Sequence, residues 1–261
     1  MRTKSKFITS LVWELKNLFR FPFPEVLLAL FTYMIFLPRG GGFAFTVSPQ
    51  SLTWGGITHN IAFKVTYEAA RFSFFAYIPI GIFASIFATL VFAYEIESGL
   101  LKVHLSHPIS RRSLFIAKLL SCFLIVFITF SVSLIFYTFF DITENVFYVI
   151  LSPDLILKML LVTTLQSLFM ISVTISFSIY SGKTSVSLIG SFATLYLIQL
   201  LSQSAKLEFL PPISFREQVS FLFSTMPLNL SEVLNFLTIP LASILLIIFS
   251  YIFFSRRLEL G

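Results

Sequence analysis

The sequence is short of charge. Charged residues make up only 11% of the 261-residue chain, against roughly a quarter in soluble domains. Hydrophobic residues make up 57%, so an ordinary water-soluble domain is excluded and one all-α membrane domain is predicted over residues 1–261. The net charge of +6 does not indicate nucleic acid, because the positive residues are scattered along the edges of apolar runs, where membrane orientation explains them.

Cysteine and clustered metal ligands are also scarce. The single cysteine, Cys122, lies inside an apolar run, so an intrachain disulfide and a cysteine-cluster metal site are excluded. We expect it to be a small buried hydrophobic residue. His104 and His107 are three residues apart, but two imidazoles alone make a poor metal site, and a solvated or docking role is favoured. No nucleophile–base constellation is visible, so we predict no metal site, no catalytic residue and no enzyme.

A complete nucleotide-binding motif is missing as well. Gly182-Lys183-Thr184 resembles the tail of a phosphate-binding loop, but the full motif needs a glycine five residues before the Gly-Lys pair. That position is Phe177, inside an apolar run. The pattern favours a tight turn between two membrane spans, and we expect ATP hydrolysis only in a separate subunit.

The apolar runs contain no ionisable residue near their middle, which counts against a proton- or sodium-coupled transporter. The run at 159–180 carries hydroxyl and amide groups instead. They either pack helices together, which is favoured, or contact substrate along a pathway. These residues are Thr163, Thr164, Gln166, Ser167, Ser172, Thr174, Ser176 and Ser178.

Six apolar runs predict six membrane-spanning helices. The stretches between them at 39–71 and 202–235 are interrupted by prolines and charges, with Glu68 and Arg71 in the first stretch. They are expected to hold loops and short interfacial elements on the outer face. Twelve of the 18 Lys and Arg residues then fall on the side of the N-terminus, so both termini are predicted to be cytoplasmic in a multi-pass plasma-membrane protein. The predicted spans are 21–37, 72–94, 119–140, 159–180, 186–201 and 236–254.

An amphipathic helix is predicted before the first span, at 4–20. Apolar side chains recur at helical spacing, with basic residues and Glu14 on the remaining, polar face and a tryptophan at the edge. This is typical of a helix lying in the membrane interface. The alternative is a soluble helix packed on a partner. The residues that indicate the membrane-interface helix are Phe7, Leu11, Trp13, Leu15 and Lys16.

The segment 95–118 separates the second and third spans. Two carboxylates end one span, a short apolar cluster follows, a proline prevents helix extension, and a serine can cap the next helix. This order predicts a short amphipathic helix in a cytoplasmic loop that docks onto a partner. The residues are Glu95 and Glu97, then Ser98, Gly99, Leu100 and Leu101, then Pro108, Ser110, Arg111 and Arg112.

The order of residues in this segment resembles that in the permeases of ABC-2-type exporters. The matching residues are Glu97, Ser98, Gly99, Leu100, Pro108, Ile109, Ser110, Arg111 and Lys118. The resemblance implies that the loop carries a coupling helix that contacts an ATPase subunit, and that the N-terminal helix is a connecting helix. It also implies two copies of an ABC ATPase, which hold ATP and Mg, and a second permease that forms a homodimer with this chain. No cofactor is expected in this chain.

Two functions remain open at this point. The first is a permease that moves substrate outward when the ATPase acts on the 95–118 loop. The second is a non-transporting membrane anchor or assembly subunit that uses the same loop to recruit a soluble partner. ATPase stimulation separates them, because an anchor need not change turnover. The substrate is open among drugs, lipids, peptides and polysaccharides.

Overall fold

The computed structural model describes residues 8–9, 11–16, 29, 57–101, 103, 110–141, 153–205, 207, 209–223 and 230–257. Most of the predicted first span, 21–37, lies outside this part of the chain, as do Phe7 and Pro108. The described residues are almost entirely helical and include no strand. This agrees with the expectation for a lipid-embedded chain, in which backbone groups must be paired within the segment.

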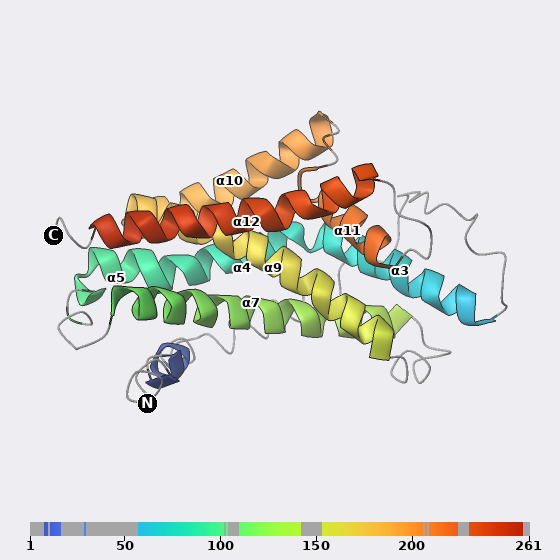
Figure 1. The fold of residues 1–261 in the computed structure, drawn as a ribbon, viewed down its shortest axis with the longest axis horizontal. Helices are drawn as coiled ribbons and strands as arrows, with labels where there is room; N and C mark the ends of the chain where they lie inside the picture. Colours follow the sequence, from blue (N-terminus) through green and yellow to red (C-terminus); the bar gives the residue numbers. More distant parts are fainter. Residues whose placement is uncertain are drawn as a thin grey trace.

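The long helices run alongside one another (Figure 1). Five described segments are long and apolar enough to cross a membrane: Tyr77–Glu97, Arg111–Tyr137, Asp154–Ser181, Thr184–Ser204 and Phe236–Arg256. They overlap the second to sixth predicted spans. The elements are α3 (Ile57–Phe75), α4 (Tyr77–Ala88), η2 (Thr89–Ala93), α5 (Tyr94–Glu97), α7 (Arg111–Asp141), α9 (Pro153–Ser181), α10 (Thr184–Ser204), α11 (Ile213–Phe223) and α12 (Leu230–Arg257).

Helix α3 differs from the expected loop with short elements at 39–71, because it is a continuous helix of 19 residues that begins at Ile57. Two charges that favoured a loop, Glu68 and Arg71, instead form an ion pair one helical turn apart, at 3.7 Å. A turn at Ala76 separates α3 from α4. Pro79 explains the break, because it has no N–H to donate to the carbonyl of Phe75 and its ring crowds that carbonyl.

A five-residue π-helical segment, η2, interrupts the first membrane-crossing segment between α4 and α5. Its first residue, Thr89, is buried and shares a hydrogen bond of 2.9 Å with the hydroxyl of Ser187 on α10. Single π turns inside helices are frequent at functional sites. Here the π turn directs a hydroxyl group toward the neighbouring helix just before the chain reaches Glu95.

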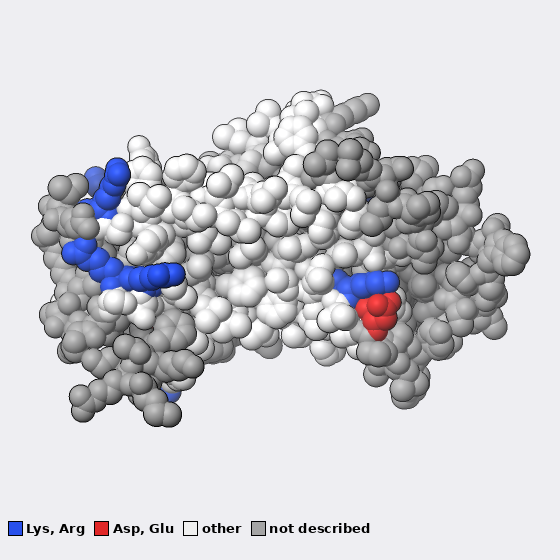
Figure 2. Space-filling model, in the orientation of Figure 1, with Lys and Arg blue, Asp and Glu red and all other residues white. Residues whose placement is uncertain are grey.

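Charged side chains gather at the two ends of the face shown in Figure 2, and a broad uncharged band separates them. At one end lie the basic residues of the helix termini, including Arg111, Arg112 and Arg256, which are exposed. At the other end Asp154 and Lys158 form an ion pair of 2.9 Å at the start of α9. An uncharged band between two charged rims is the pattern of a membrane-embedded surface.

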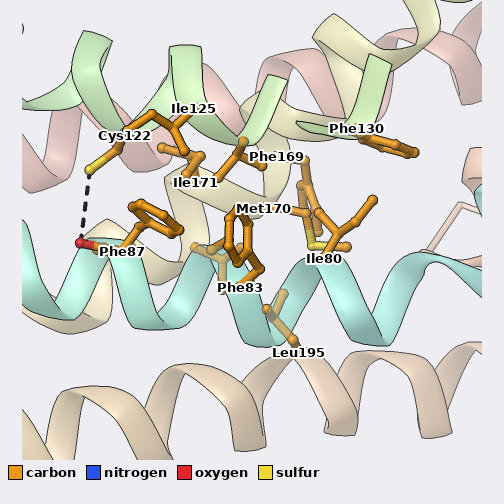
Figure 3. Close-up of a cluster of buried hydrophobic side chains, with 14 of the residues drawn as sticks. Ile80, Phe83, Phe87, Cys122, Ile125, Phe130, Phe169, Met170, Ile171 and Leu195 are labelled. Atoms are coloured by element: carbon orange, nitrogen blue, oxygen red, sulfur yellow. Dashed lines mark hydrogen bonds between the residues drawn. The ribbon is translucent and has the colours of Figure 1, made fainter. Parts of the chain in front are cut away.

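The hydrophobic core lies where α4, α7, α9 and α10 meet (Figure 3). Phe83 and Phe87 of α4 form an edge-on ring pair with centroids 4.4 Å apart. Cys122 of α7 is fully buried, with its sulfur 4.0 Å from the carbonyl oxygen of Phe87. The prediction of a small buried residue at Cys122 is therefore confirmed. Leu195 of α10 closes the cluster from the opposite side.

The membrane-crossing parts of α10 and α12 are much less buried than the rest of the bundle. Only 17% of each is buried, compared with 72% of the segment Tyr77–Glu97. Their outer faces are apolar, with Ile189, Leu197, Leu241 and Phe249 all more than half exposed. In a bilayer such faces contact lipid or another membrane protein.

Candidate functional site

Three membrane-crossing segments meet at one end of the bundle, where α5 ends and α7 and α10 begin (Figure 1). Helix α5 ends at Glu97, and the backbone N–H of Ser98 donates to the carbonyl of Tyr94 at 2.9 Å. Gly99 follows with a φ of 75°. This left-handed conformation is the usual way for glycine to end a helix. Gly99 therefore turns the chain out of the first crossing segment.

Helical conformation resumes directly after Gly99, at Leu100, Leu101 and Val103. Leu101 is 5% exposed and belongs to the hydrophobic core, whereas Val103 is 58% exposed. One side of this short helical stretch therefore packs on the bundle while another side faces outward. The docking helix itself stays a prediction, because most of its further course, including Pro108, lies outside the described residues.

Ser110 caps the start of α7, as predicted. Its hydroxyl oxygen accepts a hydrogen bond of 3.1 Å from the backbone N–H of Ser113. Arg111 and Arg112 follow in the first turn and are exposed. Positive charges at a helix N-terminus oppose the helix dipole. The helix dipole therefore does not favour these two residues, and their role toward a partner stays a prediction.

Glu97 caps the start of α10 from a distant part of the sequence. Its Oε2 accepts a hydrogen bond of 2.8 Å from the backbone N–H of Thr184 and a second one from the Thr184 hydroxyl. Lys183, which precedes α10, makes no side-chain cap of its own. A carboxylate at a helix N-terminus satisfies an unpaired N–H and matches the helix dipole. Glu97 thereby joins the end of α5 to the start of α10.

The residues that resemble a phosphate-binding loop form a turn, as predicted. Helix α9 ends at Ser181 and α10 begins at Thr184. Gly182 between them has a φ of 59°, and its N–H donates to the carbonyl of Ser178 at 3.1 Å. The turn exposes Lys183 beside Glu97 at the same end of the bundle.

A buried charge cluster lies beneath this surface. Nζ of Lys118 lies 2.7 Å from Oε1 of Glu95 and 2.7 Å from Oε1 of Glu14. Lys118 is fully buried, and the two glutamates are 8% and 2% exposed. Lys118 comes from α7, Glu95 from α5 and Glu14 from the N-terminal helical residues 11–16. Removing one partner of a buried ion pair typically costs about 3–5 kcal/mol, because the other charge is left uncompensated. The cluster therefore links charged residues from three segments of the chain.

The hydroxyl groups of α9 connect it to its neighbours. Thr163 pairs with Ser131 of α7 at 2.8 Å, and Ser178 pairs with Ser187 of α10 at 2.6 Å. Ser176 pairs with Ser250 of α12 at 2.7 Å. The two alternatives for this polar stripe were helix packing and substrate contact, and these three contacts are packing contacts. Interhelical hydroxyl pairs of this kind hold membrane helices in register.

The sequence-predicted site residues fall into two sets. Glu97, Ser98, Leu100, Ser110, Arg111 and Arg112 are exposed at the end of the bundle, and Glu95 and Leu101 are buried beneath them. In the N-terminal helix, Trp13 and Lys16 are exposed, Leu11 is partly buried and Leu15 packs against the core. Its placement in the membrane interface stays a prediction.

Sequence reasoning missed two partners. It treated Glu14 as part of a polar face, whereas Glu14 is buried against Lys118. It matched Lys118 to a family pattern but gave it no partner. The available signal was a lysine eight residues into a helix whose neighbouring residues are apolar, because such a lysine requires a carboxylate. Among the described residues no group of three or more potential metal ligands occurs.

A family model described as ABC-2 family transporter protein matches residues 20–257. The match covers the described helices from α3 to α12 together with the segment 95–118. A search of curated proteins found no match.

Proposed function

The chain belongs to the ABC-2 transporter family and is a membrane permease component of an ABC transporter, and we propose that it works as the permease subunit of an ATP-driven exporter. A separate ATPase subunit acts on the 95–118 segment from the cytoplasm. Substrate then moves outward as the membrane helices change their arrangement. The plasma membrane is the proposed location, with both termini cytoplasmic.

One observation carries this proposal: the residues of the 95–118 segment are tied to three membrane-crossing segments at once. The segment continues α5, Glu97 holds the start of α10, and Glu95 holds Lys118 of α7. A force applied at the exposed surface of Leu100 and Val103 would therefore displace the ends of all three. A loop attached to a single span would not distribute motion in this way.

The charge distribution supports the orientation and the class of transporter. Arg111 and Arg112 at the start of α7, Lys183 just before α10 and Arg256 near the end of α12 belong to helix ends that lie together in Figure 1, as expected for the cytoplasmic side. Among the described residues, the membrane-crossing segments carry charged side chains only toward their ends. A coupling ion would have no charged partner at mid-depth, which favours an external energy source.

The assembly we propose contains two copies of this chain and two ATPase subunits. The exposed apolar faces of α10 and α12 provide surface for a second permease in the bilayer. ATP and Mg bind to the ATPase subunits, and this chain holds no cofactor. Substrate would pass between the two permeases.

The test is co-expression with a candidate ATPase, purification through a tag on the permease, and measurement of ATP turnover in lipid. Turnover is then measured for Glu97→Ala and Arg111→Ala, with Lys158→Ala at the opposite end of the bundle as the control. We expect co-purification, and turnover that falls in the first two variants while the complex stays assembled. If no ATPase binds, or if ATP turnover in both variants equals that of the parent complex, the chain is an anchor or assembly subunit instead.

A further inference from the structure

We propose that Lys118 is a positioning residue that fixes the N-terminal helix to the cytoplasmic ends of α5 and α7, so that this helix moves with them as one rigid unit. If the proposed function is correct, the N-terminal helix takes part in ATP-driven motion, and this part of the inference rests on the proposed function. The rigid connection itself can be tested in the permease alone.

The geometry places one ammonium group between two carboxylates from distant parts of the chain. Both N–O distances are 2.7 Å, to Glu14 and to Glu95. Because an ammonium carries three donors, Lys118 can hold both carboxylates at the same time. Glu14 brings the N-terminal helix to this point, and Leu15 next to it packs against the core. Figure 1 shows the N-terminal helix beside the start of α7.

Burial makes the connection specific. With Lys118 fully buried and Glu14 only 2% exposed, water cannot readily replace either partner. If the N-terminal helix slid with Glu14 still buried, this carboxylate would lose its ammonium partner. An apolar contact would tolerate sliding of the helix over the bundle, whereas a buried ion pair requires a definite position. A buried charge cluster contributes little to stability compared with apolar packing. It does fix the relative position of the segments that carry the charges.

The two halves of the cluster have separable roles. Contacts between α5, η2 and α7 do not depend on Glu14, because Phe92 of η2 contacts Phe115 of α7 with ring centroids 5.9 Å apart. Glu14→Ala leaves Lys118 paired with Glu95, so the bundle keeps a balanced buried pair. Lys118→Met leaves two carboxylates together in an apolar environment, and that variant is expected to fold poorly. Glu14→Ala is therefore the informative substitution.

The experiment measures the distance between spin labels on the N-terminal helix and on α7 in lipid nanodiscs. Labels are attached at cysteines replacing the exposed residues Lys16 and Arg112, in a Cys122→Ser background. A second pair, Arg112 and Val186, reports on the bundle itself. We expect a narrow Lys16–Arg112 distribution in the parent protein and a broad one in Glu14→Ala, while the Arg112–Val186 distribution stays unchanged in both.

Two further variants keep the proposal falsifiable. Val12→Ala, at a residue of the same helix that is 44% exposed, is the matched control and should leave the distribution narrow. The exchange Glu14→Lys with Lys118→Glu restores an opposite-charge pair between the two segments and should narrow the distribution again. If the Lys16–Arg112 distance distribution is unchanged in Glu14→Ala, the proposed rigid connection is wrong, whether or not an ATPase binds.

The functional consequence is measured in the assembled complex with ATP and vanadate. In the parent complex the Lys16–Arg112 distance should be the same with and without ATP and vanadate, because both labels sit on one rigid unit. ATP turnover should fall in Glu14→Ala, because the N-terminal helix would no longer move together with α5 and α7. If Glu14→Ala has a broad distance distribution but unchanged ATP turnover, the rigid connection stands, and the N-terminal helix has no part in transmitting ATP-driven motion.

Discussion

The carboxylate of Glu97 accepts a hydrogen bond of 2.8 Å from the backbone N–H of Thr184, although 87 residues separate them in sequence. Glu97 lies at the end of α5, and Thr184 is the first residue of α10. The contact therefore joins the surface segment that follows α5 to a membrane-crossing helix that is otherwise sparsely packed. A shift of the exposed segment would therefore displace the first turn of α10 through this hydrogen bond.

Replacing Glu97 by alanine should loosen the first turn of α10. The backbone N–H of Thr184 loses its acceptor, and the N-terminal N–H groups of a helix have no intrahelical partner to replace it. Hydrogen–deuterium exchange of peptides covering residues 184–188 should rise in Glu97→Ala and rise less in Glu97→Gln, which keeps an acceptor oxygen.

Glu217→Ala is the control for this measurement, since Glu217 lies on α11 and pairs with Arg216. Exchange at 184–188 should match the parent protein in that variant. Equal exchange in Glu97→Ala and the parent would show that Glu97 does not cap α10.

Gly99→Ala should destabilise the protein by about 1 kcal/mol, because a left-handed backbone conformation is unfavourable for residues with a Cβ. Space is not the reason, since a Cβ at Gly99 would meet nothing within 4 Å. Gly99→Asn should therefore cost less than Gly99→Ala, because asparagine tolerates this conformation better. Thermal unfolding of the purified permease measures the order, and a lower midpoint for asparagine than for alanine would contradict it.

Ser187→Ala should weaken the packing of α10 against the bundle. The Ser187 hydroxyl pairs with Ser178 at 2.6 Å and with Thr89 at 2.9 Å. At about 0.6 kcal/mol for an interhelical hydrogen bond in a membrane, losing both costs roughly 1 kcal/mol. Denaturant titration in detergent measures this cost. Ser185→Ala is the matched control, because Ser185 is exposed on the same helix, and equal losses in both variants would remove the role assigned to Ser187.

Much of the architecture could be predicted because lipid imposes it. Backbone groups must be paired inside the membrane, so long apolar runs become helices, and five described segments agree with this. Local rules also worked at Ser110, whose hydroxyl caps α7, and at Gly182, which forms the turn between α9 and α10. These features depend on a few neighbouring residues.

Two of the features that were missed depend on contacts between distant residues. Glu14 looked like part of a polar helix face, and only the approach of Lys118 makes its burial favourable. The capping of Thr184 by Glu97 likewise requires two helix ends to meet. Helix α3 was missed because Glu68 and Arg71 suggested a loop, while on a helix they pair with each other. Hydropathy alone does not predict such pairs.

We expect an ATPase subunit to contact the surface of the 95–118 segment. Photo-crosslinking tests it most directly, with a photoreactive amino acid placed at Val103, which is 58% exposed, or at Leu157, which is 64% exposed near the opposite end of the bundle. In cells that also express the candidate ATPase, illumination should join the ATPase to the permease labelled at position 103 and not at position 157. Crosslinking from position 157 alone, or from neither position in an assembled complex, would show that the ATPase does not contact the 95–118 segment at Val103.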